Sequence, residues 1–205
     1  MSKKHKIIDN FLNENDLKKV KSTIESNSMP WFYERIFLNN NKKYKIIDNF
    51  LDEKKLKIVK SSIESSSMPW LYEDEISEAK KKDKHGTFYL THLAYINNKA
   101  HSDLFSIIGN MFINALKIKS LIRIKANFYP NQGQFVEHEY HVDYKFKHIG
   151  AIFSLNTCNG YTKLHDGTKI DSVENRLLIF DASTKHCSTN TTNAERRLNI
   201  NFNYF

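Results

Sequence analysis

The sequence predicts an α+β protein whose second half is a β-sandwich or barrel. After Ser120 the chain is a series of eight short segments with period-two alternation, separated by Gly, Asn and Asp. No helical segment lies between them to supply the crossovers of a parallel sheet, which leaves a sandwich or barrel. Before them, residues 102–118 repeat apolar side chains at helical spacing. With 205 residues and 40% hydrophobic content, the chain is long enough for one ordinary core.

The first third of the chain contains an internal duplication. Residues 6–34 recur as residues 45–73, with 22 of 29 positions identical. Each copy predicts a short apolar strand or turn, a capping Asn13 or Asp52, an amphipathic helix and a Met-Pro-Trp end. Two copies are too few for a solenoid, which needs three or more stacked units.

A domain with one slot for this helix makes the two copies compete for it. We expect the copy nearer the core, residues 45–73, to be docked. Residues 1–43 then lie outside as an appendage: an extra layer, a swapped arm or a homodimer contact. A recent duplication without functional consequence is equally consistent with the sequence.

The middle of the chain predicts one strand and one core helix. Residues 87–96 are rich in aromatic and β-branched side chains, which favours a strand. Over 102–118 the apolar residues share one helical face, so this helix should pack on the core. Its face consists of Leu104, Ile107, Ile108, Met111, Phe112 and Ala115.

The eight strands that we expect are 121–129, 138–144, 148–156, 160–164, 168–173, 176–181, 185–190 and 196–204. Alternation places the side chains of the first strand on two faces. Its apolar face carries Ile122, Ile124, Ala126 and Phe128, and its polar face carries Arg123, Lys125, Asn127 and Tyr129. The last strand opposes Leu198, Ile200, Phe202 and Tyr204 to Arg197, Asn199, Asn201 and Asn203. A row of Arg and Asn on a final strand predicts a polar pocket inside the barrel.

The net charge of +8 is diffuse. Residues 1–85 hold 18 Lys+Arg against 14 Asp+Glu, and the remainder holds 13 against 9, so each part carries +4. No basic module with interleaved aromatic residues stands out, which disfavours nucleic acid as the partner.

Compartment signals are few. Cys158 and Cys187 are the only cysteines. They have neither the number of a disulfide framework nor the spacing of a zinc site. The sequence contains no apolar run of about 18 residues and opens with a Lys-rich segment. We therefore expect a soluble cytoplasmic protein, in the host cytoplasm for a viral protein, with no membrane partner.

A His-x-Asp pattern on a strand supplies two metal ligands on one face. It occurs twice in the sequence, as His101-Ser102-Asp103 and as His141-Val142-Asp143. The first opens the amphipathic helix, where Ser102 or Asp103 is better explained as a cap. The second lies on an expected strand and is followed 45 residues later by His186. Arg196 and Arg197, at the start of the last strand, can pair with a carboxylate.

The order of these motifs resembles a known family. The motifs are Tyr129-Pro130-Asn131-Gln132-Gly133-Gln134, His141-Val142-Asp143, Ser154-Leu155-Asn156, Gly160-Tyr161-Thr162, Asp166-Gly167-Thr168, residues 174–181, His186 and residues 197–201. Together they resemble the 2-oxoglutarate and Fe(II)-dependent oxygenase superfamily, and most of all its prolyl-hydroxylase-like branch from phages and viruses. The resemblance covers residues 120–205, and residues 45–73 are similar to the N-terminal helix region of the same viral proteins.

The resemblance implies a double-stranded β-helix (jelly-roll) core over residues 120–205 with N-terminal helices packed on it. Residues 44–119 would be its helical support, and 44–205 one oxygenase domain. Fe(II) would be held by His141, Asp143 and His186, which would thereby be the catalytic residues. The co-substrate 2-oxoglutarate would bind Arg197, with Tyr129 and Asn127 as further contacts; a one-residue register slip would exchange Arg197 for Arg196.

The reaction that the resemblance implies is hydroxylation of a small-molecule or peptidyl substrate, with release of succinate and carbon dioxide. Nothing in the sequence identifies that substrate. Two alternatives stay open: a catalytically silent β-helix domain used for binding or assembly, and a basic protein associated with nucleic acid.

Overall fold

The computed structural model describes residues 13–16, 18, 44–73 and 88–205. Residues 14–16 are helical, and the longer helices are α3 (Glu53–Ile63) and α4 (Asp103–Leu116). Its strands are β1 (Tyr44–Ile47), β2 (Leu71–Glu73), β3 (Tyr89–Ile96), β4 (Lys99–Ala100), β5 (Leu121–Pro130), β6 (Ile149–Ser154), β7 (Tyr161–Leu164), β8 (Lys169–Asp171), β9 (Arg176–Asp181), β10 (His186–Ser188) and β11 (Arg196–Tyr204).

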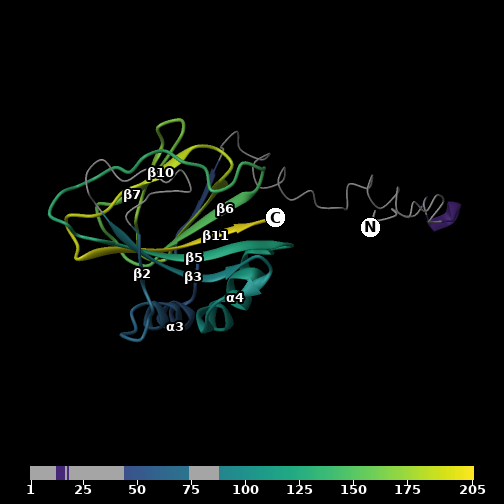
Figure 1. Ribbon diagram of the computed structural model, residues 1–205, viewed down its shortest axis with the longest axis horizontal. Helices are drawn as coiled ribbons and strands as arrows, with labels where there is room; N and C mark the ends of the chain where they lie inside the picture. The colour runs from purple at the N-terminus through teal and green to yellow at the C-terminus, as the bar shows by residue number, and fades with distance from the viewer. Residues whose placement is uncertain (1–12, 17, 19–43, 74–87) are drawn as a thin grey trace, which may run out of the picture.

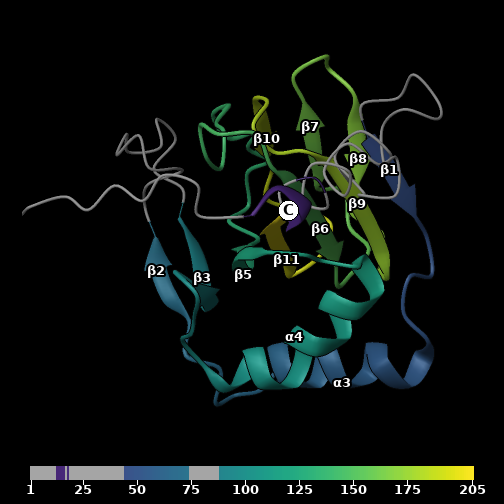
Figure 2. The same cartoon turned by 90° about the vertical axis from the view of Figure 1, so that its right-hand side faces the viewer.

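Two antiparallel sheets make up the β-structure. The larger has the strand order β1-β9-β6-β11-β5-β3-β2, with β4 added to β3, and the smaller has the order β10-β7-β8. Helices α3 and α4 lie together on one side of the large sheet, and β10 and β7 lie on the other side (Figures 1 and 2). This arrangement of helices, large sheet and small sheet gives two buried layers.

The layer between the helices and the large sheet is the main hydrophobic core. Helix α4 contributes residues at i, i+4 spacing. Of the face that the sequence predicts, Leu104, Ile108 and Phe112 are buried, whereas Ile107 and Ala115 are exposed and were wrongly included. The sheet contributes the apolar faces of β5 and β11, again as the alternation predicts. Members of this core include Val59, Ile63, Leu104, Ile108, Phe112, Leu116, Ile124, Ala126, Leu198, Ile200, Phe202 and Tyr204. The polar faces of β5 and β11 therefore point toward the second sheet.

Helix α3 is fixed by its ends and by one buried stripe. Asp52 caps its N-terminus, accepting a hydrogen bond from the Lys55 N–H at 2.9 Å. Val59 and Ile63, one turn apart, are its buried residues. The copy at 45–73 is thus docked on the sheet, as expected, whereas nearly all of residues 1–43 lies outside the described residues.

One expectation about the elements was wrong. Residues 138–144 form no regular strand: Glu137 and His141 make isolated bridges to Thr189 and His186. These bridges hold the segment in place of the continuous ladder that we expected. Within residues 44–119, the strand expected at 87–96 is present as β3, and β1, β2 and β4 join the same large sheet.

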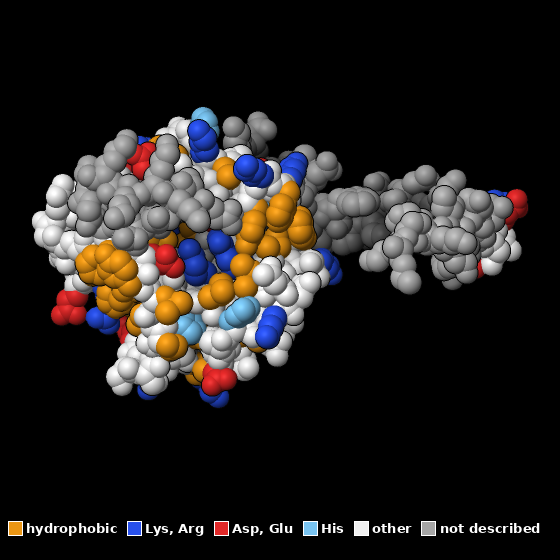
Figure 3. All heavy atoms as spheres, in the orientation of Figure 1, with side chains coloured by type: hydrophobic (Ala, Val, Ile, Leu, Met, Phe, Trp, Pro, Cys, Tyr) orange, Lys and Arg blue, Asp and Glu red, His pale blue; other side chains and the backbone are white. Residues whose placement is uncertain are grey.

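The surface agrees with a diffuse charge. On the face shown in Figure 3, the described Lys and Arg side chains are scattered among acidic and hydrophobic ones. Among the described residues, no helix has the length and apolar character needed to cross a membrane.

Candidate metal centre

His141 and His186 are brought together by backbone pairing across 45 residues of sequence. The His141 N–H donates to the His186 carbonyl, and the His186 N–H donates to the His141 carbonyl, each at 2.9 Å. This reciprocal pair sets the two rings side by side, with their centroids 4.7 Å apart. Asp143 follows two residues later, and its own N–H donates to the Ala182 carbonyl at 3.3 Å. The segment of His141 and Asp143 is thus fixed beside β10.

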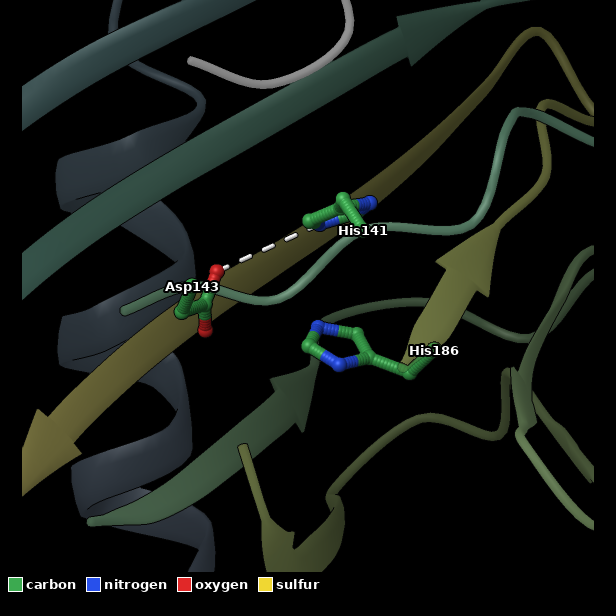
Figure 4. A group of neighbouring side chains, drawn as sticks. All are labelled: His141, Asp143 and His186. Carbon is green, nitrogen blue, oxygen red and sulfur yellow. Dashed lines mark ion pairs between the residues drawn. The ribbon is translucent and has the colours of Figure 1, made fainter. Parts of the chain in front are cut away.

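His141, Asp143 and His186 form a cluster of three possible metal ligands. One donor atom from each lies within 4.8 Å of the others, and Figure 4 shows the three side chains converging. The Nε2 of His141 is 4.0 Å from Oδ1 of Asp143. Ligand atoms about 2.1 Å from one ion and at right angles to each other lie about 3 Å apart. Side-chain movements on the order of 1–2 Å would therefore close the cluster on an ion.

The backbone selects which imidazole nitrogen is available. Nδ1 of His186 lies 3.0 Å from the Thr184 carbonyl, and Nδ1 of His141 lies 3.3 Å from the Glu139 carbonyl. A carbonyl oxygen can only accept, so Nδ1 carries the hydrogen in both rings. The lone pair then resides on Nε2, which is the pattern of a metal-binding histidine with its second nitrogen held by the protein.

The carboxylate of Asp143 is buried and held by three donors. Arg123 forms an ion pair with Oδ1 at 3.0 Å, while the side-chain amides of Asn203 and Asn201 donate to Oδ2 at 2.8 and 3.2 Å. Burial alone would raise the pKa of Asp143. The charge of Arg123, followed by those of the two histidines and the Asn203 hydrogen bond, outweighs burial and holds this pKa well below its usual value.

The histidine beside it is kept neutral. Burial and the proximity of His186 lower the pKa of His141 to about 4, although the charge of Asp143 opposes the shift. At neutral pH the site therefore presents a neutral imidazole and an ionised carboxylate. These are the protonation states in which both groups bind metal ions.

The cluster opens onto a cavity of about 310 Å³ between the two sheets. The polar face of β5 lines it with Arg123, Lys125, Asn127 and Tyr129, and β11 lines it with Asn199 and Asn201. The pocket predicted from alternation is thus confirmed. Among the described residues, the buried Oδ1 atoms of Asn127 and Asn201 have no hydrogen-bond partner. Buried acceptors of this kind usually have one, so a polar molecule fits this cavity.

Arg197 lies behind the cavity wall. The residue is 1% exposed, and its guanidinium donates to the Thr189 carbonyl at 2.9 Å and to the Thr162 hydroxyl at 3.1 Å. Nε has no hydrogen-bond partner among the described residues. The guanidinium also stands 5.6 Å from the ring centre of Tyr129. Thr162 and Tyr129 line the cavity and Arg197 does not, so these two residues separate it from the open space.

Arg196 points to the other side of the sheet. It pairs with Glu64 of the α3 end at 3.1 Å and stands over the Phe128 ring. The register Arg197↔Tyr129 in the β11–β5 pair fixes this difference. Of the two arginines, Arg197 is therefore the one that faces the cavity side.

Several residues of the site were not recognised as such from the sequence. Arg123 and Lys125 were placed on the correct face but given no role. Lys125 is a cavity-lining cation whose pKa is lowered to about 8 by burial and by the charge of Arg123. Asn203 was predicted only as part of a polar row on the last strand. Its hydrogen bond to Asp143 joins residues 60 positions apart, so no local sequence pattern predicts this contact.

The other histidine patterns lie elsewhere. His101-Ser102-Asp103 begins α4, with Ser102 at the N-cap, and is not part of the cluster. Ser102 Oγ lies 2.6 Å from Nε2 of His92. His138 contacts Ser188 and the Tyr129 ring, and it is likewise outside the cluster.

The donor set fits iron(II). Two imidazole nitrogens and one carboxylate oxygen on one side of an ion are the ligands of the facial triad in non-haem iron oxygenases, which leaves three positions open. The open side here faces a polar cavity with cations in or behind its wall.

Known proteins resemble this chain in structure, but none was found by sequence. No family model matches the sequence, and no curated protein is significantly similar to it. Solved structures do match. A prolyl hydroxylase from Trichoplax adhaerens, in complex with a hypoxia inducible factor oxygen degradation domain peptide fragment, has a TM-score of 0.61 and 15% identity, covering 97% of this chain and 96% of that one.

Two further matches are complexes with 2-oxoglutarate, which is also called alpha ketoglutarate. The viral collagen prolyl hydroxylase from Paramecium Bursaria Chlorella virus-1, as its 2OG complex, has a TM-score of 0.53 and 14% identity, covering 80% of this chain and 96% of that one. The epimerase SnoN, in complex with Fe3+, alpha ketoglutarate and nogalamycin RO, has a TM-score of 0.58 and 10% identity, covering 86% of this chain and 84% of that one. These likenesses show the fold, a jelly-roll of the oxygenase type.

Proposed function

We propose that the protein is an Fe(II)- and 2-oxoglutarate-dependent dioxygenase in which His141, Asp143 and His186 hold the iron. The observation that carries this proposal is the convergence of these three side chains at the edge of a buried polar cavity. Iron bound there, with 2-oxoglutarate and dioxygen, supplies an oxidation that releases succinate and carbon dioxide and hydroxylates a substrate C–H bond. The likeness in fold to oxygenases supports the same conclusion.

The protein's own contribution is positioning. The carbonyls of Glu139 and Thr184 hold both imidazoles with Nε2 toward the cluster. Arg123 and Asn203 hold Asp143 ionised and in place. Such support of metal ligands by neighbouring hydrogen bonds maintains their orientation when the ion is absent. Asp143 and His186 are buried, which limits the contact of these two side chains with bulk water.

The distal carboxylate of 2-oxoglutarate is assigned to Arg197. This cation is buried, and one of its N–H groups lacks a partner among the described residues. A buried charge without a counterion is costly, and an incoming carboxylate would compensate it. Tyr129 and Thr162, which separate Arg197 from the cavity, would contact the same molecule. Asn127 lies on the cavity wall, and its side-chain amide N–H would be a further donor to the same molecule.

Lys125 is the alternative partner for that carboxylate. It lines the cavity directly, whereas Arg197 does not. Arg197 is preferred because its planar donor set suits two-point binding of a carboxylate, which a lysine cannot provide.

The substrate is a small molecule or a peptide. The prolyl hydroxylases among the structural matches favour a peptidyl proline, but the epimerase SnoN shares the fold to a similar degree. The viral origin of one match agrees with the phage or viral type of the sequence resemblance.

The test is iron-dependent conversion of 2-oxoglutarate to succinate without added substrate. Uncoupled turnover of this kind requires only the metal and co-substrate sites. The protein reconstituted anaerobically with Fe(II) and then exposed to air is expected to form succinate, measured by mass spectrometry, whereas the H141A/H186A variant is not. Equal succinate formation by both proteins, or none by the reconstituted native chain, would contradict the proposal.

A further inference from the structure

Residues 45–73, here called the second repeat, occupy a well-defined docking slot on the rest of the domain. Residues 6–34 are the first repeat. Strand β1 of the second repeat pairs with β9. The side chain of Asn175 accepts from the Leu51 N–H at 2.9 Å and donates to the Leu51 carbonyl at 2.8 Å. The slot thus binds the backbone of the incoming segment at one fixed point.

Side chains of the second repeat complete the docking. Three ion pairs join it to the domain: Asp48–Arg176 at 2.6 Å, Lys60–Glu174, and Glu64–Arg196 at 3.1 Å. Val59 and Ile63 are buried in the main core. The Pro69 carbonyl lies 3.0 Å from Nδ1 of His92, and Trp70 packs edge-on against Phe128 at 5.5 Å.

The first repeat carries an identical residue at every one of these positions. Its counterparts, 39 residues earlier, are Asp9, Leu12, Val20, Lys21, Ile24, Glu25, Pro30 and Trp31. The two repeats differ at seven positions, which in the second repeat are Asp52, Lys54, Lys55, Ile58, Ser62, Ser66 and Leu71. Six of these are exposed, and the seventh, Ser62, is half-buried and aligns with Thr23. Sequence divergence has therefore fallen outside the docking contacts.

The described part of the first repeat begins its helix in the same way. Residues 14–16 are helical, and Asn13 Oδ1 accepts from the Asp16 N–H at 2.9 Å. Asp52 Oδ1 accepts from the Lys55 N–H at the same distance in the second repeat. The cap that starts α3 is thus reproduced in the copy.

We infer that the docking slot is a binding site for either repeat, and that the first repeat replaces the second in a minority of molecules by exchange within one chain. Each chain has one slot and two repeats. Exchange between two chains would gain no additional docking contact and would cost the entropy of association. The slot therefore does not by itself favour a homodimer.

The length of the connection to β3 determines the fraction of molecules in which each repeat is docked. From Glu73 to Tyr89 the connection is residues 74–88, or 88 − 73 = 15 residues, and from Glu34 it would be residues 35–88, or 88 − 34 = 54 residues. Loop-closure weight falls as about the three-halves power of length, which favours the second repeat roughly sevenfold. The exchanged form is then on the order of a tenth of the molecules.

The second repeat reaches the wall of the metal cavity. Glu73, its last residue, lines that cavity and accepts a hydrogen bond from the Thr91 hydroxyl at 3.3 Å. In the exchanged form Glu34, an identical residue, takes this position.

The first experiment measures stability in the full chain. Two Asp substitutions in the second repeat, V59D/I63D, should raise the unfolding equilibrium constant by less than about tenfold, because the first repeat then fills the slot. The matched V20D/I24D variant should be nearly native. All four substitutions together should raise the constant by at least about 100-fold more, since no repeat can then dock without burying charge. If V59D/I63D is as unstable as the fourfold variant, the inference is overturned.

The second experiment locates the first repeat by cross-linking. Lys60 faces Glu174, and Lys21 is its counterpart. A K21C/E174C protein treated with a short bis-thiol reagent should form an intrachain cross-link in a minority of molecules, and K60C/E174C in most. K19C/E174C is the control, because Ile58, the counterpart of position 19, lies about 200° around α3 from Lys60. The native Cys158 and Cys187 are buried.

Both outcomes of the cross-linking decide the matter. An intrachain product at position 21 above the level of position 19 supports exchange. Equal yields at the two positions, or products only between chains, overturn it. Neither experiment uses iron or turnover, so the inference stands or falls independently of the proposed function.

Discussion

At the scale of single residues, the three proposed ligands are distinguished by donor atoms that lie within 4.8 Å of one another. His141→Ala and Asp143→Ala are each expected to weaken binding of Fe(II), or of Co(II) as a coloured substitute, by more than about 100-fold, exceeding what loss of a supporting hydrogen bond costs. The far-ultraviolet circular dichroism should stay unchanged. Metal titration followed by absorbance measures the first effect.

A matched control for the metal titration is His138→Gln. His138 is buried only three residues from His141, but its ring contacts Ser188 and Tyr129 instead of the cluster. Its replacement should leave metal affinity within about threefold, well below the loss expected when a group that supports a ligand is removed. Equal losses in the His138 and His141 variants would assign the cluster a structural role.

The choice between Arg197 and Lys125 can be tested in the same way. Arg197→Met is expected to raise the Kd for 2-oxoglutarate by at least about 30-fold in the Mn(II)-loaded protein, because a buried charge-assisted pair is worth about 2 kcal/mol or more. Lys125→Met should change it by less than about fivefold. Isothermal titration calorimetry provides the measurement, and the reverse order of effects would move the carboxylate contact to Lys125.

The sequence could select His141, Asp143 and His186 as candidates because their residue types and order agree with a metal site. The structure places their donor atoms within 4.8 Å of one another. Asn203 and Arg123 could not be selected in this way, because their contacts with Asp143 cross the sheet from strands that lie far away in sequence. The importance of a supporting residue depends on which residue folds against it, and local pattern does not contain that information.

At the scale of elements, the turn before β9 anchors the segment that leads into α3. Asn175 has a left-handed backbone, with φ at 62°, and its buried amide satisfies both the N–H and the carbonyl of Leu51. Asn175→Ala should therefore cost about 2–4 kcal/mol, since it leaves two backbone groups without partners and strains the backbone. Urea denaturation measures the loss.

Asn175→Gly separates the two causes. Glycine tolerates the positive φ but makes no side-chain hydrogen bond, so it should retain most of the loss. Full recovery of stability in the glycine variant would mean that backbone strain, and not the bond to Leu51, dominates. Because Asn175 binds backbone groups, its loss should affect either docked repeat alike.

The strand expected at 138–144 shows where element prediction stops. The alternation there correctly placed His141 and Asp143 on one side, which is what the site needs. Regular strand structure also requires a partner with a continuous ladder, and β10 is only three residues long and already paired with β7. Periodicity describes the faces of a segment, whereas pairing depends on the edges that other segments leave open.

At the scale of the whole molecule, a sandwich or barrel could be predicted because alternation without intervening helices leaves few architectures, whereas the jelly-roll was implied only by the family resemblance. The position of β1 could not. It joins the sheet through β9, more than 120 residues later, and so ties the duplicated segment to the domain. A four-residue strand has too little periodicity to reveal its partner, and the duplication supplied two equal candidates for one place.

Ligands bound at the cluster and in the cavity would connect the two sheets, because the cavity is lined by β5 and β11 of the large sheet and by β7 and β10 of the small one. A ligand at 100 times its Kd stabilises the native state by about 2.7 kcal/mol. For a chain of this size each kcal/mol raises Tm by about 2–4 °C, so saturating Mn(II) should raise Tm by roughly 5–10 °C. Added 2-oxoglutarate should raise it further.

Variants assign that shift to the site, with differential scanning calorimetry as the measurement. H141A/H186A should lose the response to Mn(II), and with it the response to 2-oxoglutarate. R197M should keep the rise in Tm caused by Mn(II) and lose the further rise caused by 2-oxoglutarate. A thermal shift with Mn(II) that survives in H141A/H186A would place metal binding elsewhere on the chain. Because the measurement needs neither substrate nor dioxygen, it separates binding of metal and co-substrate from turnover.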